Sequence, residues 1–171
     1  MANSAQRLLV IGPSWVGDMV MAQSLFMTLK ARQPGATIGV VAPKWSQPIL
    51  ERMPEVDEVL PLTVGHGEFG LASRRELANR LRGRFDRAIV LPRSWKAALV
   101  PFMARIPERI GFLGEHRYGL LKERRKLDKQ VLDQTVKRFV SLGLPLEEAA
   151  SGDFVLPKPR LQIDRDNLVN L

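Results

Sequence analysis

The chain has 171 residues, of which 45% are hydrophobic and 26% charged, and these values predict one globular domain with a substantial core rather than a disordered chain. Cysteine is absent, which excludes disulfides, thiolate metal sites and cysteine nucleophiles and is compatible with a reducing cytoplasm. The net charge of +8 predicts a basic surface that attracts anionic partners. No apolar run approaches the roughly 20 residues that span a bilayer, and residues 1–6 lack the apolar region of a signal peptide, so we expect neither a membrane span nor export.

The first predicted unit is a strand, a glycine-containing turn and a helix. Residues 8–11 form a short apolar run, typical of a strand buried on both faces, and a helical pattern begins at Met19. This order opens an α/β sheet, in which ligands bind where the strands end. Gly12 and Gly17 have the spacing of a phosphate-binding loop, but Asp18 and Met19 stand where that loop requires Lys and Ser or Thr. The sequence therefore argues against an ATPase, and the G-x-G-x-x-G dinucleotide fingerprint is also absent.

Asp18 is the most unusual residue of this turn. A carboxylate at the mouth of a ligand cleft is suited to act as a general base. An aspartate at a helix start also caps the helix and complements its dipole. The spacing alone leaves both interpretations open.

Strands and helices then alternate along the chain. Further strands are predicted over 37–41, 58–62, 87–91 and 109–112, and further helices over 45–53, 73–83, 94–103 and 128–143. Ser73, Ser94 and Asp128 are the predicted caps of the last three helices. The alternation predicts right-handed crossovers and a mostly parallel sheet with helices on both faces, which is an α/β fold.

Two segments differ in composition from the rest. Residues 105–126 hold seven Lys or Arg against three Glu, which fits nucleic acid, an anionic membrane surface or an anionic glycolipid as partner. No recognition-helix motif supports nucleic acid, and residues 122–126 alone also fit a solvated face. Residues 156–160 have the composition of a linker, so we predict a domain over 1–144 and a linker followed by an unfinished unit over 145–171.

Four stretches of the sequence carry a resemblance to a known family. They are residues 12–25, 51–57, 89–102 and 111–121, and in this order they resemble the lipopolysaccharide heptosyltransferases. The resemblance runs from about Arg7 to about Gly143. One position departs from the family pattern, because Arg93 stands where a small polar residue is expected.

The resemblance implies an architecture and a reaction. Members have two Rossmann-like domains facing across a cleft, the glycosyltransferase B arrangement, and this chain corresponds to the first, acceptor-binding domain. Residues 145–171 are then the linker and the truncated start of the nucleotide-sugar-binding domain. The implied reaction transfers heptose from ADP-L-glycero-D-manno-heptose to the first heptose of the lipopolysaccharide inner core, by an inverting displacement without a metal or another cofactor. His66 and His116 lie fifty residues apart, and no His, Asp and Glu cluster has metal-ligand spacing.

The resemblance also indicates site residues. Asp18 is the expected base. The acceptor carries carboxylates and phosphates, so loops after the strands are expected to present cations and N–H donors. The expected acceptor-binding residues are Ser14, Trp15, His66, Arg93, Ser94, Lys96 and Arg117. A surface role for Lys96, a turn role for His66 and packing under the turn for Trp15 remain alternatives.

The implied partners are the lipid-linked anionic acceptor, ADP-heptose through the second domain, and the inner face of the inner membrane, to which a cytoplasmic protein would bind peripherally. Nucleic acid is not expected. The alternative is a non-catalytic basic α/β module that binds nucleotides or anions. Nucleotide binding by the isolated chain would favour that alternative, because the first domain of a heptosyltransferase is expected to bind nucleotide weakly or not at all.

Overall fold

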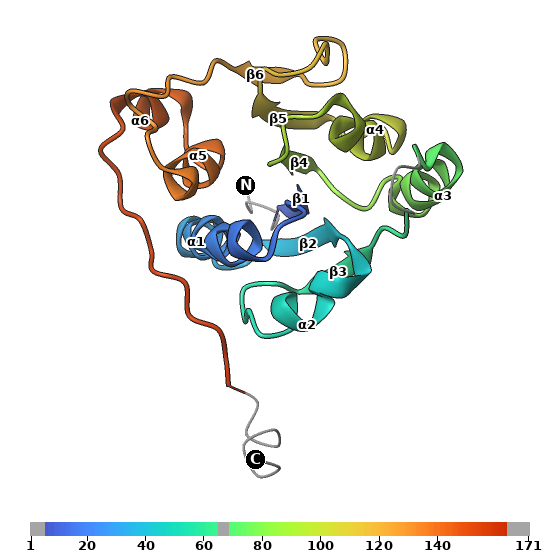
Figure 1. Cartoon of the computed structure of the whole chain (residues 1–171), viewed down its shortest axis with the longest axis horizontal. Coiled ribbons are helices and arrows are strands. Elements are labelled where there is room, and N and C mark those ends of the chain that lie inside the picture. The colour runs from blue at the N-terminus through green and yellow to red at the C-terminus, as the bar shows by residue number, and fades with distance from the viewer. Residues whose placement is uncertain (1–5, 65–68, 164–171) are drawn as a thin grey trace, which may run out of the picture.

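One six-stranded parallel sheet organises the part of the chain that the computed structural model describes, residues 6–64 and 69–163. The strand order is β3-β2-β1-β4-β5-β6, with every neighbouring pair parallel (Figure 1). The strands are β1 Arg7–Ile11, β2 Thr37–Ala42, β3 Glu58–Pro61, β4 Arg87–Val90, β5 Glu108–Phe112 and β6 Glu123–Arg125. The order reverses between β1 and β4, which is where ligands bind in sheets of this kind.

The central strands are the ones that the apolar runs predicted. Residues 8–11 of β1 and 88–90 of β4 are buried, because helices cover both faces of the sheet. Leu8 pairs with Ile38 of β2, and Val10 pairs with Ile89 of β4. The predicted α/β class and mostly parallel sheet are therefore confirmed.

The edge strand β6 was not predicted. Its sequence is Glu123, Arg124 and Arg125, which has no apolar signal, and the strand exists because it pairs with β5. Arg125 is only 6% exposed: its guanidinium donates to the carbonyl oxygens of Ser141 and of Leu144 and pairs with Glu123. The interpretation of 122–126 as a purely solvated face is wrong at Arg125.

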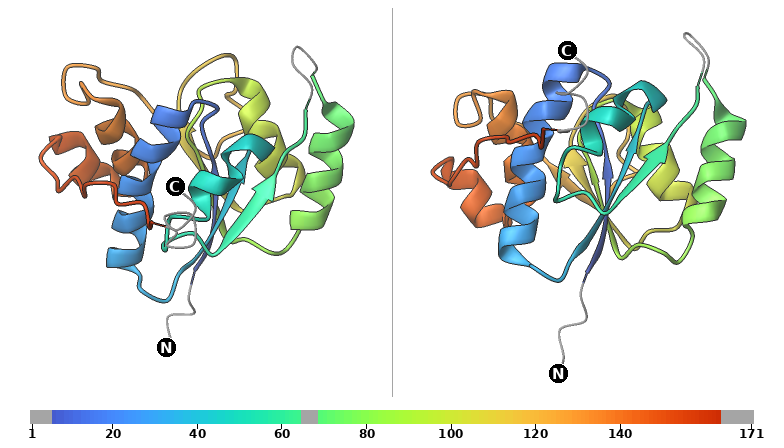
Figure 2. Two further views of the ribbon diagram at one scale, coloured as in Figure 1. Left: turned by 60° about the horizontal axis from the view of Figure 1, so that its bottom comes forward. Right: turned by 90° about the horizontal axis from the view of Figure 1, so that it is seen from below.

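The helices form two layers, one on each face of the sheet (Figure 2). One layer contains α1 Val16–Arg32, α2 Gln47–Leu50 and α5 Thr135–Leu142, and the other contains α3 Leu71–Leu81 and α4 Trp95–Met103. A short helix α6 Leu146–Ser151 packs against α5, and a 3-10 turn η1 Lys44–Ser46 precedes α2. The first core is centred on residues such as Phe26 and Ile38, and the second on residues such as Leu81 and Ala98.

Several predicted helix starts differ from the observed ones. The last long helix does not begin at Asp128, whose carboxylate accepts from the backbone N–H of Gln130 at 2.8 Å and closes a separate turn before α5. The helix predicted from Ser73 begins at Leu71 after Gly70, which has a φ of 59°, and no side chain caps it. The helix predicted over 45–53 is η1 followed by the four-residue α2. At Asp128 the polar side chain thus satisfies a nearby turn instead of capping the helix.

Residues 152–163, which we call the C-terminal strap, run in extended form along α1 (Figure 1). The amide group of Gln23 binds the backbone of Arg160 twice, accepting from its N–H at 2.8 Å and donating to its carbonyl at 2.9 Å. The Ser24 hydroxyl donates to the carbonyl oxygen of Pro157 at 2.6 Å. Gln23 and Ser24 are fully buried, so the segment predicted as a linker is bound to the domain over this stretch.

The Gln23 contact can be tested with trypsin. Gln23→Leu fills a similar volume and leaves the backbone groups of Arg160 without their partner, which favours local opening. We expect cleavage of the Arg160–Leu161 bond to become about tenfold faster, because roughly 1.4 kcal/mol of lost local stability is a factor of ten. Mass spectrometry follows this one bond, and Gln134→Leu, at an exposed position, is the control. Equal cleavage rates in the two variants would show that Gln23 does not fasten the strap.

Candidate functional site

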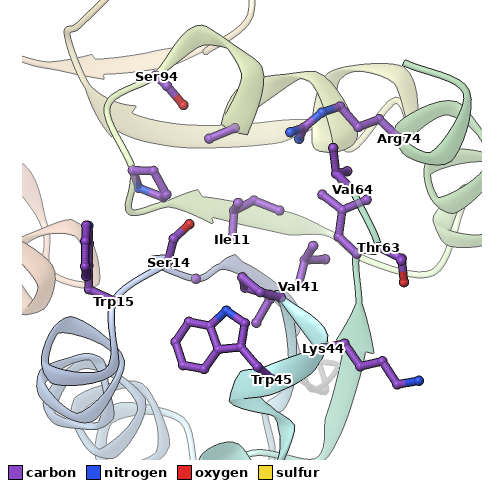
Figure 3. A pocket seen from close by; sticks show the side chains of 16 residues that line it. Ile11, Ser14, Trp15, Val41, Lys44, Trp45, Thr63, Val64, Arg74 and Ser94 are labelled. Carbon is purple, nitrogen blue, oxygen red and sulfur yellow. The ribbon is translucent and has the colours of Figure 1, made fainter. Parts of the chain in front are cut away.

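A cleft with a volume of about 1090 Å³ lies at the carboxyl ends of β1, β2, β3 and β4. Its walls come from the segments that follow these strands and from α3 and α4 (Figure 3). Ile11 and Val41 form part of its floor, so the base of the cleft is apolar. This position matches the reversal of strand order between β1 and β4.

Three of the predicted acceptor-binding residues line the cleft: Ser14, Trp15 and Ser94. Ser14 and Ser94 come from opposite walls, one after β1 and one before α4 (Figure 3). Trp15 is 77% exposed, which excludes the alternative that its ring packs under the turn. Ser94 is the N-cap residue of α4 but makes no capping hydrogen bond with its side chain.

Asp18 lies in the first turn of α1, three residues after the cleft residue Trp15 in the sequence. It is half-buried and does not line the cleft itself. The N-cap of α1 is Trp15 and no side chain caps the helix, so the specific prediction that Asp18 is the cap is wrong. Its charge still complements the dipole at the third helical position.

Arg93 and Lys96 are both exposed at the start of α4, outside the cleft lining. One guanidinium nitrogen of Arg93 donates to the carbonyl oxygen of Leu113 at 3.3 Å. The Lys96 ammonium lies 5.7 Å from the centre of the Phe69 ring, in a cation–π contact. Their role as acceptor contacts remains a prediction, and His66 lies outside the described residues.

Arg117 contradicts its predicted role as an acceptor contact. Its side chain is fully buried, and within the described part of the chain its guanidinium donates only to the backbone carbonyl oxygens of Phe112, Pro92 and Ser94. Burial is the main cause that lowers the pKa of Arg117 to about 10, and the neighbouring charge of Arg93 acts in the same direction. The side chain is therefore still protonated at neutral pH, but it cannot touch a ligand in the cleft.

The cleft residues that were not predicted include two cations and an aromatic ring: Lys44, Arg74 and Trp45. Trp45 is 47% exposed, and Figure 3 shows it on the wall formed by η1. Arg74 extends from α3, where it donates to the carbonyl oxygens of Phe69 at 3.1 Å and Lys96 at 3.2 Å. Burial lowers the pKa of Arg74, and among the described residues it forms no ion pair with a carboxylate. The sequence signal was weak, because Arg74 directly follows Ser73, the predicted cap of this helix.

Within residues 6–64 and 69–163, no three His, Asp or Glu side chains gather in a way that would hold a metal ion. None of the helices in this part of the chain is long and apolar enough to cross a bilayer.

Comparison with known proteins places the chain in a family. A sequence profile described as glycosyltransferase family 9 (heptosyltransferase) matches residues 74–168, which is more than half of the chain. The chain belongs to glycosyltransferase family 9. This result confirms the resemblance carried by the four sequence stretches.

Two similar proteins show how far the similarity extends along the chain. The chain is 56% identical over 138 residues to lipopolysaccharide heptosyltransferase 2 of Salmonella typhimurium, which is 80% of this chain and 40% of that protein. It is 43% identical over 163 residues to lipooligosaccharide heptosyltransferase 2 of Haemophilus ducreyi, which is 95% of this chain and 47% of that protein. The chain therefore spans less than half the length of these two relatives.

The solved structure of a similar protein has the same fold. The structure of the Escherichia coli ADP-heptose lipopolysaccharide heptosyltransferase II superposes with a TM-score of 0.82 at 45% identity, covering 96% of this chain and 49% of that one. The predicted fold is thus found in about half of a known heptosyltransferase.

Proposed function

We propose that this chain is the acceptor-binding half of a type II lipopolysaccharide heptosyltransferase. The protein would transfer heptose from ADP-L-glycero-D-manno-heptose to the first heptose of the inner core. The observation that carries the proposal is the 56% identity to the Salmonella typhimurium lipopolysaccharide heptosyltransferase 2 over 80% of this chain. The E. coli protein of the same fold is named for ADP-heptose, which supports that donor. The half of the relatives that this chain does not cover would hold most of the nucleotide sugar.

The residues around the cleft suit an anionic sugar acceptor. Arg74 and Lys44 offer charge-assisted hydrogen bonds to carboxylates or phosphates. The exposed rings of Trp15 and Trp45 offer faces on which a sugar can stack, and Ser14 offers a hydroxyl. Arg93, Lys96 and Ser94 add donors at the start of α4, where a helix N-terminus already favours anions.

Asp18 is the proposed general base. The acceptor hydroxyl loses its proton to this carboxylate as its oxygen attacks the anomeric carbon of the donor heptose. The bond from that carbon to the diphosphate oxygen breaks, ADP leaves with the bonding electron pair, and the single displacement inverts the carbon. A positioned carboxylate contributes about 10²–10⁴-fold to such a step. The proposed chemistry uses no metal or other cofactor, because the base and the cationic side chains supply the proton acceptor and the charge.

Activity of a joined protein tests the proposal. The joined protein consists of this chain followed by the second half of the E. coli relative. We expect it to transfer heptose from ADP-heptose to a core oligosaccharide that ends at its first heptose, and we expect the 171-residue chain alone to show no transfer. Tight ADP binding by the chain alone, with no transfer by the joined protein, would favour the non-catalytic nucleotide- or anion-binding module instead.

The protein is further proposed to act at the cytoplasmic face of the inner membrane, as a peripheral protein. Lys122, Arg124 and Lys126 are exposed on and beside the edge strand β6, where they would meet an anionic lipid surface. Each well-placed basic side chain adds about 1 kcal/mol to such binding, and salt weakens it.

Vesicle sedimentation tests this surface. Replacing Lys122, Arg124 and Lys126 with Gln is expected to weaken binding to phosphatidylglycerol-containing vesicles by roughly 100-fold, because about 3 kcal/mol is lost. Replacing the exposed Arg75 and Arg80 of α3 and its C-cap residue Arg82 with Gln removes the same charge elsewhere and serves as the control. An equal loss in both triple variants would indicate that net charge, rather than the β6 surface, attracts the membrane.

A further inference from the structure

Arg117 joins two loops beside the cleft. Its Nη1 donates to the carbonyl oxygens of Pro92 at 2.6 Å and Ser94 at 3.3 Å, in the loop between β4 and α4. Its Nε donates to the carbonyl oxygen of Phe112 at 3.0 Å, at the end of β5, and Nη2 donates to the same oxygen. Pro92 and Ser94 line the cleft, whereas Arg117 does not. The side chain therefore holds a wall of the cleft from behind.

The two loops are also packed closely around this contact. A Cβ atom at Gly114 would overlap the carbonyl oxygen of Arg93, and one at Gly111 would lie 3.2 Å from Nη2 of Arg117. His116 has a φ of 34°, in the left-handed region that non-glycine residues rarely adopt. His116 directly precedes Arg117, and backbone strain of this kind persists only where the surrounding structure imposes it.

The chemistry of this contact requires arginine. A planar guanidinium presents five N–H donors in a fixed fork, and three carbonyl oxygens in two loops accept from it. A lysine ammonium is a single point donor on a flexible chain and cannot reproduce this fork. Removal of the guanidinium leaves buried carbonyl oxygens without partners, which favours a rearranged loop.

We propose that Arg117 is a positioning residue that sets the conformation of the Pro92 and Ser94 wall of the cleft and thereby the affinity for acceptor. The effect on affinity rests on the proposed function, whereas the effect on the loop does not. Arg117 acts through the backbone of the loop and touches no ligand.

Hydrogen–deuterium exchange of the 171-residue chain tests the loop. Arg117→Lys keeps the charge but loses the fork, and we expect exchange in residues 92–97 to become about tenfold faster. Arg109→Lys is the matched control, because Arg109 also donates to backbone carbonyls, those of Leu120 and Ile106, but extends from the amino-terminal part of β5, away from the cleft. Gly114→Ala disturbs the same loop through the Arg93 carbonyl while leaving Arg117 in place, so it provides a second variant if Arg117→Lys does not fold.

Kinetics of the joined protein test the consequence. We expect Arg117→Lys to raise the KM for acceptor about tenfold, with the KM for ADP-heptose unchanged and the Arg109→Lys enzyme close to wild type. The proposal would be overturned if exchange in this loop were unchanged in both Arg117→Lys and Gly114→Ala, or if exchange became faster throughout the chain in both variants. Faster exchange in the loop together with a wild-type KM for acceptor would also overturn it. If the joined wild-type protein transfers no heptose, only the proposed function is contradicted. Hydrogen–deuterium exchange does not depend on activity, so it still tests the effect of Arg117 on the loop.

Discussion

Asp18→Asn in the joined protein is expected to lower turnover about 100-fold or more while changing stability little. Asn keeps the size and polarity of the side chain but removes the proton acceptor, and loss of a general base costs about 10²–10⁴-fold. Asp18 is half-buried in the first turn of α1 and does not cap it, so only its favourable charge–dipole interaction, about 0.3–1 kcal/mol, is at risk. Acceptor affinity is not expected to fall, because the acceptor is anionic and one repulsive charge is removed.

Turnover and thermal unfolding of three variants separate the possible roles. Asp18→Ala is expected to lose as much activity as Asp18→Asn, since both lack the base. Glu115→Gln is the matched control at an exposed loop carboxylate, and it is expected to retain activity. Near-normal turnover in Asp18→Asn together with a large loss in Glu115→Gln would move the base to Glu115.

Arg74→Gln is expected to weaken acceptor binding by roughly 10- to 100-fold. Hydrogen bonds to a charged group contribute about 1.5–3 kcal/mol, and Gln keeps a polar side chain without the charge. Arg74 is half-buried at the cleft, where its guanidinium donates hydrogen bonds to two carbonyl oxygens rather than to a carboxylate. Its charge is therefore available for an anionic ligand. The effect is expected in the KM for acceptor and not in the KM for ADP-heptose.

The neighbouring residue supplies the control for Arg74. Arg75 is exposed on the same helix α3 and does not line the cleft, so Arg75→Gln removes an equal charge from the protein without touching the site. An equal rise in the KM for acceptor in the two variants would show that Arg74 attracts the acceptor only through net charge. Melting temperatures of both variants report whether loss of the two carbonyl contacts of Arg74 has disturbed α3.

The candidate site was predictable where its residues follow a strand directly. Ser14 and Trp15 come immediately after β1, and Ser94 comes after β4, so the position of the strands placed them at the same edge of the sheet. Arg74 and Trp45 could not be placed in this way. They reach the cleft from α3 and η1, and their direction depends on how these elements pack against the sheet.

Arg117 shows the opposite error, because it was predicted to bind the acceptor but its side chain is buried. It has suitable chemistry and lies in a suitable loop, yet the side chain points into the protein. Nothing in residues 111–121 distinguishes an arginine that binds a ligand from one that binds backbone carbonyls. The difference is made by Pro92 and Ser94, which lie 25 and 23 residues from Arg117 along the chain and meet it only in the folded protein.

The sequence by itself determined the α/β class, the central strands β1, β2 and β4 and the family, because each of these depends on apolar runs, turn residues and motifs that are local in the chain. Tertiary structure alone decided that three charged residues form β6, that residues 152–163 bind to Gln23 and Ser24, and which arginines face the cleft. The physical reason is that these features depend on backbone hydrogen-bond partners from distant segments. A charged or polar side chain satisfies such a partner as readily as it satisfies water or a ligand, so its own residue type does not indicate which of them it meets.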